Sequence, residues 1–295
     1  MSKQSKVLVL GAGGQLGTAI TKICGNGGPA VTPLRRSDFD ADRHEPAEML
    51  AAYADHDYLV NCIAYHKVDR CEDNFAESFR INGELVMKLA RFCAGHDLTF
   101  MHISTDYVFD GVKKEPYRED DLPAPLNVYG ASKLAGEMLA AAYCPKHFVL
   151  RVSSLFGERE IRPAEVNFVE KMVRAARENR PLRVIDNQVM SPTFTDDVAR
   201  VIRFLVEDDV SGYGLYHACN GGECTWFEFA QKIFELTGLE NDLTPVSYAE
   251  FHSYAQRPQF CSMDNSRLGR LYPMRPWAQA LEDYLQTRGY LARSR

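Results

Sequence analysis

The sequence has no excess of basic residues: it carries 34 Lys and Arg against 40 Asp and Glu, a formal net charge of −6 at pH 7. A protein without a positive field gains little affinity for a nucleic-acid backbone from counterion release. We therefore expect no nucleic-acid partner. A few arginines and a helix N-terminus can still form a local site for a small anion, so an anionic ligand stays open.

The sequence also lacks long apolar runs and paired cysteine motifs. No run approaches the roughly 20 apolar residues that a membrane-spanning helix requires, and residues 1–5 lead directly into an apolar strand instead of a signal-peptide core. The eight cysteines form no Cys-x-x-Cys pair, and no His stands at zinc-ligand spacing. We expect reduced, mostly buried thiols, no metal site, no membrane partner and a cytoplasmic location.

What is present is a globular composition with alternating strand and helix patterns. Of 295 residues, 45% are hydrophobic and 25% are charged, which is typical of a folded protein. Short apolar runs predict strands at 6–10, 30–34, 58–62, 99–103 and 147–152, with amphipathic stretches at 45–54 and 75–94 and a helix at 129–143. This alternation predicts an α/β fold with a doubly wound parallel sheet.

A glycine-rich turn follows the first predicted strand and opens a helix. Its spacing is G-x-x-G-x-x-G, with glycines at Gly11, Gly14 and Gly17. Glycines let a backbone turn sharply and approach a pyrophosphate, whose charge is then stabilised by free N–H groups at the helix N-terminus. The alternative is a turn that only packs tightly. The strand before the turn and the helix after it favour a dinucleotide cofactor.

Two arginines, Arg35 and Arg36, end the second predicted strand, where an Asp or Glu would hold the ribose hydroxyls of NAD. Two guanidinium groups suit a 2′-phosphate, which favours NADP(H) and keeps NAD(H) as the alternative cofactor. Asp40 can accept a hydrogen bond from the adenine amine. A solvated surface pair remains the alternative interpretation of the two arginines.

A hydroxyl, a phenol and an ammonium are predicted to converge at the C-terminal edge of the sheet. Thr105 follows the fourth predicted strand, and Tyr129 and Lys133 lie one helical turn apart on one helix face. Bringing a Tyr pKa from about 10 to about 7 requires about 4 kcal/mol. One positive charge about 4 Å away supplies about that much at an effective dielectric constant of about 20. An exposed Tyr/Lys pair is the alternative.

Several stretches together resemble the extended short-chain dehydrogenase/reductase family, and within it the dTDP-4-dehydrorhamnose reductase group. They are GAGGQLG (11–17), NCIAYHKVDRCE (61–72), STDYVFDG (104–111), PYREDDLPAPLNVYGASKLAGE (116–137), DNQVMSPT (186–193) and QRP (256–258). The resemblance implies a Rossmann domain at 1–153 that binds NADP(H), to which 192–222 returns, and a smaller substrate-binding domain at 154–295. It also implies NADPH-dependent reduction of a nucleotide-linked 4-keto-6-deoxy sugar, as in dTDP-rhamnose biosynthesis.

The resemblance assigns roles to individual residues. Thr105 orients the keto oxygen, Tyr129 protonates it, and Lys133 holds the nicotinamide ribose and lowers the Tyr pKa. The cofactor-binding positions are Gly11, Gly14, Gln15, Leu16, Arg35, Arg36, Asp40, Ile63, Ala64 and Tyr65, together with Tyr129 and Lys133. The substrate positions are Val68, Tyr107, Asn167, Gln188 and Arg257, of which Arg257 suits the diphosphate.

The sequence departs from the group where a Trp usually packs on the sugar, because Ser154 stands there. This leaves the identity of the nucleotide sugar open, including a reductase or epimerase of another sugar. Trp226 is interpreted as a core residue at a helix start, and a replacement stacking platform is the alternative. PYREDDLPAPLN also resembles the regulatory β subunit of methionine adenosyltransferase, so an NADP-binding subunit that grips a partner protein is the alternative function. A homodimer is compatible with the resemblance.

Overall fold

The computed structural model describes residues 4–160, 166–251 and 253–292, and its centre is a six-stranded parallel sheet. The strand order is β10-β5-β4-β3-β1-β2. The strands are β1 (Lys6–Leu10), β2 (Ala30–Leu34), β3 (Tyr58–Asn61), β4 (Thr99–Thr105), β5 (His147–Val152) and β10 (Gly214–His217). The predicted α/β class and the doubly wound parallel sheet are confirmed.

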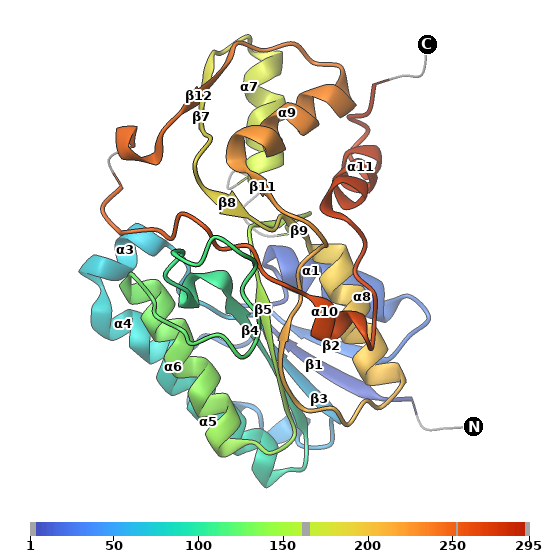
Figure 1. Cartoon of the computed structure of the whole chain (residues 1–295). Coiled ribbons are helices and arrows are strands. Elements are labelled where there is room, and N and C mark those ends of the chain that lie inside the picture. The colour runs from blue at the N-terminus through green and yellow to red at the C-terminus, as the bar shows by residue number, and fades with distance from the viewer. Residues whose placement is uncertain (1–3, 161–165, 252, 293–295) are drawn as a thin grey trace.

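Helices cover both faces of this sheet (Figure 1). One face carries α1 (Gln15–Gly25) and α8 (Thr195–Glu207), and the other carries α5 (Leu85–Gly95) and α6 (Val128–Tyr143). Alternate residues of β1 point to opposite faces of the sheet. Val7 and Val9 pack with α1 and α8, and Leu8 and Leu10 pack with α5 and α6. A strand buried on both faces has an uninterrupted apolar sequence, and this is why β1 was predictable.

Short elements complete the part of the chain around the sheet. They are α2 (Pro46–Met49), η1 (Ala51–Tyr53), α3 (Val68–Asp73), α4 (Phe75–Phe79), η2 (Arg80–Glu84) and η3 (Asp106–Val108). The amphipathic stretch 75–94 thus contains a π-helical segment, η2, between α4 and α5. Among the described residues, none of the helices is long and apolar enough to cross a membrane.

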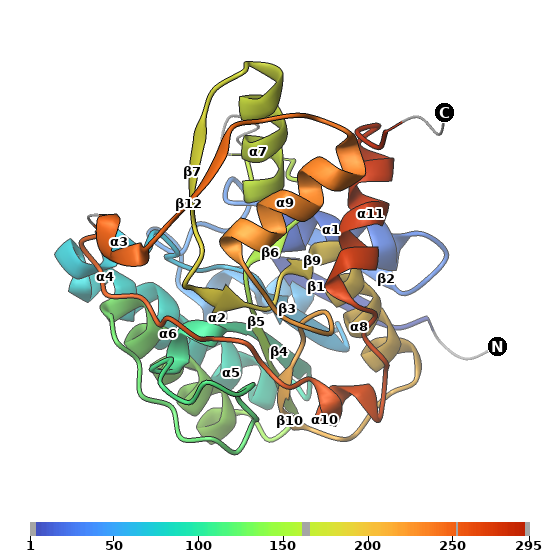
Figure 2. The ribbon, with the colours of Figure 1, turned by 45° about the horizontal axis from the view of Figure 1, so that its top comes forward.

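A second lobe lies against the C-terminal edge of the sheet (Figure 2). Its short strands pair as β6 with β9, β7 with β12 and β8 with β11. The strands are β6 (Leu155–Phe156), β7 (Leu182–Ile185), β8 (Val189–Met190), β9 (Thr193–Phe194), β11 (Cys224–Thr225) and β12 (Leu243–Val246). Its helical segments are α7 (Phe168–Arg177), α9 (Trp226–Thr237), η4 (Tyr248–Glu250) and α11 (Trp277–Thr287). The short helix α10 (Ser266–Gly269) lies beside the central sheet instead, where its Leu268 packs in the core under α1 and α8.

The second lobe has its own apolar core between α7, α9 and α11. Phe156, Phe194, Phe229 and Tyr284 are buried in it. The chain does not stay in this lobe, because α8 packs on α1 and β10 extends the central sheet beside β5. The division into domains at 1–153 and 154–295, with 192–222 returning to the first, remains a proposal.

Candidate functional site

A pocket of about 690 Å³ opens at the C-terminal ends of the central strands. Both lobes line it, since Gly14 and Tyr129 come from the sheet region and Trp226 from α9. Fourteen predicted residues line it, namely Gly11, Gly14, Gln15, Leu16, Arg36, Asp40, Ile63, Ala64, Tyr65, Val68, Thr105, Tyr107, Tyr129 and Lys133. Open parallel sheets place their ligands at this edge.

The glycine turn brings the N-terminus of α1 to the pocket. Gly11 has φ +75°, a conformation that L side chains rarely adopt. A Cβ on Gly17 would lie 2.3 Å from the carbonyl oxygen of Gly11, so the turn and the first helical turn are in close contact. Gly14, the N-cap residue, has no side chain to fill the space before the helix. The turn therefore fits a phosphate group at the positive end of the helix dipole.

The two predicted arginines differ in their surroundings. Arg36 lines the pocket, and its guanidinium donates to Asp40 at 3.4 Å and Asp42 at 2.6 Å. Arg35 is not among the pocket-lining residues in the described part of the chain. Its Nε and Nη2 donate to both carboxylate oxygens of Glu160, at 2.8–3.3 Å. A phosphate ligand would have to compete with these carboxylates for both arginines.

Tyr129 is positioned by the start of α6. The side chain of Asn127 caps the helix by accepting a hydrogen bond from the N–H of Gly130. A Cβ on Gly130 would lie 2.1 Å from the carbonyl oxygen of Tyr107, so only glycine lets α6 approach η3 this closely. The rings of Tyr107 and Tyr129 then meet edge to face, with centroids 5.8 Å apart.

Lys133 lies one turn further along α6 and is almost completely buried. Its Nζ donates to the carbonyl oxygen of Ile103 at 2.6 Å and lies 3.1 Å from His102 Nε2. Burial lowers the pKa of Lys133 to about 8, although the Glu137 carboxylate raises it. Burial, with the Lys133 charge, also holds the pKa of His102 well below its usual value. A neutral imidazole can accept the lysine's hydrogen bond.

Burial is the dominant influence on Tyr129. It raises the pKa of the phenol, whereas a hydrogen bond with Thr105 lowers it. This direction differs from the lowering that was expected from Lys133. The physical reason is that the Lys133 ammonium is directed at Ile103 and His102 on β4, while desolvation is the largest influence on the phenol. The phenol is therefore held in its protonated form.

Within the described part of the chain, three predicted substrate residues do not line the pocket and hydrogen-bond to other protein groups instead. Asn167 is the N-cap of α7, and its Nδ2 donates to Gly157 O and Tyr284 Oη, both at 2.9 Å. Gln188 is buried and donates to Pro258 O at 3.4 Å. Arg257 forms a two-point ion pair with Asp69 at 2.9 and 3.1 Å. Their substrate roles stay predictions.

Three residues that line the pocket were not among the site residues assigned from the sequence. Trp226 is half-buried there and packs at a tilt of 52° against Phe168, with ring centroids 4.8 Å apart, so it belongs to both the core and the pocket wall. Ser154 also lines the pocket and has φ +42°. Asp106 lines it and is buried. The available signals were the position of Trp226 at a predicted helix start and of Asp106 directly after Thr105.

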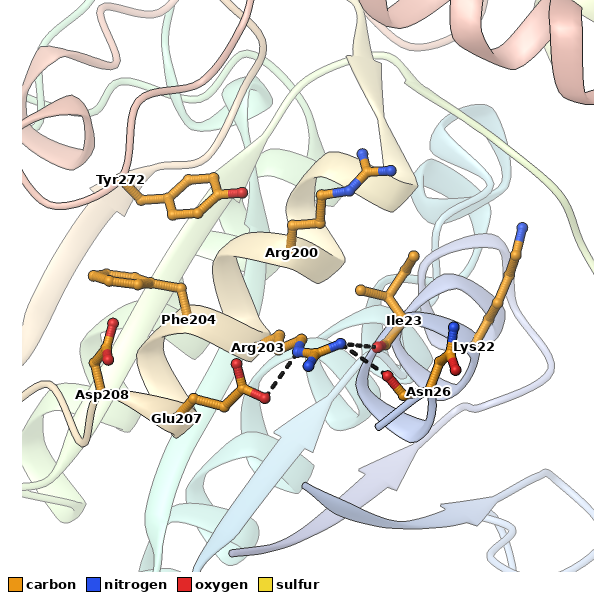
Figure 3. A pocket seen from close by; sticks show the side chains of 9 residues that line it. All are labelled: Lys22, Ile23, Asn26, Arg200, Arg203, Phe204, Glu207, Asp208 and Tyr272. Atoms are coloured by element: carbon orange, nitrogen blue, oxygen red, sulfur yellow. Dashed lines mark hydrogen bonds and ion pairs between the residues drawn. The ribbon is translucent and has the colours of Figure 1, made fainter. Parts of the chain in front are cut away.

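A second hollow, of about 450 Å³, lies between α1, α8 and the segment that follows α10 (Figure 3). Its central charge, Arg203, donates to Glu207 at 2.9 Å and to the carbonyl oxygens of Ile23 and Asn26, both at 3.1 Å. These hydrogen bonds attach the C-terminal end of α1 to α8. The hollow lies away from the glycine turn and from Tyr129, so we interpret it as a helix-packing feature.

The described residues contain no group of three or more His, Cys, Asp or Glu that could hold a metal ion. All eight cysteines are free thiols, and seven of them are buried. Burial raises the pKa of Cys62 to about 12, and it likewise raises that of Cys219 to about 12. At neutral pH these thiols are protonated and poor nucleophiles.

The parallel sheet, the glycine turn and the Tyr/Lys pair on α6 place the chain in the class of dinucleotide-binding short-chain dehydrogenases/reductases. A model of the RmlD substrate binding domain family matches residues 5–289. The chain belongs to this family.

Relatives and solved structures match the chain over nearly its whole length. It is 35% identical over 287 residues to the spore coat polysaccharide biosynthesis protein SpsK of Bacillus subtilis, covering 96% of this chain and 98% of that protein. It is 32% identical to the dTDP-4-dehydrorhamnose reductase of Aggregatibacter actinomycetemcomitans, covering 95% and 98%. The structure of the Bacillus anthracis dTDP-4-dehydrorhamnose reductase in complex with NADP matches with a TM-score of 0.90 and 32% identity, covering 97% and 100%.

Proposed function

We propose that the protein is an NADPH-dependent reductase of a nucleotide-linked 4-keto-6-deoxy sugar of the dTDP-4-dehydrorhamnose type. The observation that carries this proposal is the convergence of Thr105, Tyr129 and Lys133 in one pocket with the glycine turn. Relatives above 30% identity bear the name dTDP-4-dehydrorhamnose reductase, which favours the reductase over the NADP-binding regulatory subunit.

The residues around the turn fit NADP(H). The N–H groups at the start of α1 bind the pyrophosphate, and Arg36, with Arg35 after release from Glu160, binds the 2′-phosphate. When bound, the reduced nicotinamide supplies the hydride. Lys133 holds the nicotinamide ribose through the ammonium proton that Ile103 O and His102 leave unused. The relative from Bacillus anthracis, solved in complex with NADP, supports NADP(H) as the cofactor.

Reduction of a ketone also requires a proton on the carbonyl oxygen. Tyr129 supplies it from the phenol that burial keeps protonated, and Thr105 donates a hydrogen bond that orients the keto oxygen. Val68, Tyr107 and the half-buried Trp226 form the wall that contacts the sugar. Expulsion of water from this lining strengthens each of these polar contacts.

The test is NADPH oxidation by the purified protein with a dTDP-4-keto-6-deoxy sugar, with NADH measured in parallel. Tyr129→Phe is expected to lower kcat about 10²-fold or more, because the proton donor is lost. NADPH affinity, measured by cofactor fluorescence, should stay nearly unchanged in this variant. Turnover by Tyr129→Phe at the wild-type rate would eliminate the proposed proton donor.

Two further assignments belong to this proposal. We retain a cytoplasmic location, which suits the eight unpaired cysteines. We also retain a homodimer as the assembly, to be tested by light scattering of the purified protein.

A further inference from the structure

A cluster of mixed charge lies at one end of the proposed cofactor pocket. Arg36 and Asp42 line the pocket there, on the segment that follows β2. A second arginine, Arg80, is the first residue of η2. Asp42 Oδ2 accepts a hydrogen bond of 2.6 Å from Arg36 Nη2, and Asp42 Oδ1 accepts one from Arg80 Nη2. One carboxylate thus bridges two guanidinium groups.

The ion pair between Arg36 and Asp42 is open to the pocket. It is shorter than the contact with Asp40, which accepts from Arg36 Nε at 3.4 Å. The side chains of Arg36 and Asp42 are 66% and 40% exposed, so a cofactor phosphate can reach both. A phosphate that enters here meets an arginine that already pairs with a carboxylate.

Arg80 holds the Asp42 carboxylate in this place. Its Nε and Nη2 donate to the two carboxylate oxygens of Glu77 at 2.8 and 2.7 Å. Its Nη1 donates to Ala41 O at 2.7 Å, on the backbone next to Asp42. The guanidinium that binds Asp42 is therefore fixed by contacts that do not involve Arg36, and the carboxylate stays near Arg36 when a ligand arrives.

The 2′-phosphate of NADP(H) and the Asp42 carboxylate need the same cation. A phosphate monoester carries nearly two negative charges at pH 7 and forms charge-assisted hydrogen bonds with a guanidinium. It either displaces Asp42 from Arg36 or binds beside it, and in both cases the like charges weaken its binding. NADH has a neutral hydroxyl at this position, which a carboxylate oxygen can accept from. Asp42 therefore opposes one cofactor and not the other.

We propose that Asp42 sets the cofactor selectivity of this site by competing with the 2′-phosphate for Arg36. This inference rests on the proposed function, because it takes Arg36 as a group that binds the 2′-phosphate. It adds a residue that makes the preference for NADPH smaller than the arginines alone would give.

Asp42→Asn tests the proposal by cofactor binding alone. The amide keeps the size of the side chain and an oxygen that can accept from a ribose hydroxyl, and it removes the negative charge. Arg80 keeps its bonds to Glu77 and Ala41 O, so Tm should stay nearly unchanged. By cofactor fluorescence, we expect NADPH to bind about three- to tenfold more tightly at low salt, and NADH within about twofold of the wild type.

Three controls separate competition at Arg36 from a general charge effect. Glu84→Gln removes one negative charge from the same segment, η2, but Glu84 pairs with Lys88 and is not among the described residues that line the pocket. It should leave the ratio of NADPH to NADH affinity unchanged. In an Arg36→Ala background, Asp42→Asn should lose most of its gain, because the contested cation is absent. High salt should also reduce the gain, since the charges are exposed.

Two fragments of the cofactor isolate the 2′-phosphate. Adenosine 2′,5′-bisphosphate carries it and 5′-AMP does not, and calorimetry can measure both. Asp42→Asn should tighten binding of the bisphosphate only. Equal changes for the two fragments, or no change for either, would overturn the proposal.

The outcome for the proposed function is read separately, because none of these measurements needs the sugar. A wild-type protein that binds both cofactors and shows the expected shift in Asp42→Asn, but does not reduce the sugar, would count against the proposed function alone. Reduction of the sugar with an unchanged cofactor ratio in Asp42→Asn would count against the role of Asp42 alone. A wild-type protein that does not bind NADPH would overturn both.

Discussion

Removing the Glu137 carboxylate is expected to destabilise the protein strongly, because its partner Arg151 would remain buried with its charge. Arg151 Nε and Nη2 donate to the two carboxylate oxygens at 2.9 and 2.7 Å. The exposed fractions are 2% for Arg151 and 6% for Glu137. The guanidinium also lies over the ring of Phe109, 4.9 Å from its centroid. The pair joins β5 to α6 beneath the proposed site.

The magnitude follows from the burial of the pair. Loss of one partner of a buried ion pair costs about 3–5 kcal/mol. An unfolding entropy of about 2.1 cal/mol/K per residue gives about 0.6 kcal/mol/K for the 295 residues. Glu137→Leu should therefore lower Tm by about 5–8 °C. The double variant Glu137→Leu/Arg151→Met replaces both charges by apolar groups and should recover most of this loss.

The assay is calorimetry of the single and double variants at one pH, with NADPH titrations of the same proteins. The Glu137 carboxylate raises the pKa of Lys133, so its removal should also shift the loss of NADPH affinity to lower pH. A Tm of Glu137→Leu within about 1 °C of the wild type would refute the reasoning, because a buried charge without a partner must lower the free energy of unfolding by much more than that. A double variant less stable than the single one would refute it equally.

Three further outcomes are expected. NADPH affinity should weaken as pH rises through about 8, because the Lys133 pKa lies near that value and only the ammonium form is charged; titrations with Lys133→Met should lack this pH dependence. Glu160→Gln frees Arg35 and should tighten NADPH several-fold more than NADH, and equal changes would separate Arg35 from the 2′-phosphate. Trp226→Leu should raise KM for the sugar nucleotide about tenfold with kcat and NADPH affinity nearly unchanged, whereas unchanged KM would remove Trp226 from the substrate wall.

The central strands could be predicted from the sequence because both of their faces are buried. In β1 the apolar run Val7–Leu10 coincides with all but the first residue of the observed strand, and in β5 the apolar run Phe148–Leu150 marks the strand although the buried Arg151 interrupts it. β4 runs two residues beyond its predicted end, since Ser104 and Thr105 keep the register with Arg151 and Val152 of β5. Ser104 donates to the buried Glu137, so its polar hydroxyl is hydrogen-bonded inside the strand, beyond the apolar run from which the strand was predicted.

The second lobe could not be predicted in the same way. Strands β6, β8, β9 and β11 have two residues each, and a two-residue run has no period. Their pairing depends on segments distant in the chain, such as Cys224 beside Met190. Helix α9 is an exception, because Thr225 and Glu228 form a capping box at its start and Gly238 ends it with φ +64°.

The same distinction separates the parts of the site. Residues whose geometry is set by neighbours in the chain, such as the glycine turn and the Tyr129/Lys133 spacing, lie together in the pocket as the sequence predicts. Two of the three predicted arginines pair with carboxylates far away in the chain: Glu160 is 125 residues from Arg35, and Asp69 is 188 residues from Arg257. The sequence shows where a cationic side chain stands, but it does not show which distant carboxylate forms an ion pair with it. Exposed pairs contribute little to stability, so a phosphate can replace Glu160 at Arg35 more readily than it can replace Asp69 at the half-buried Arg257, whose Nη1 also donates to Ala255 O.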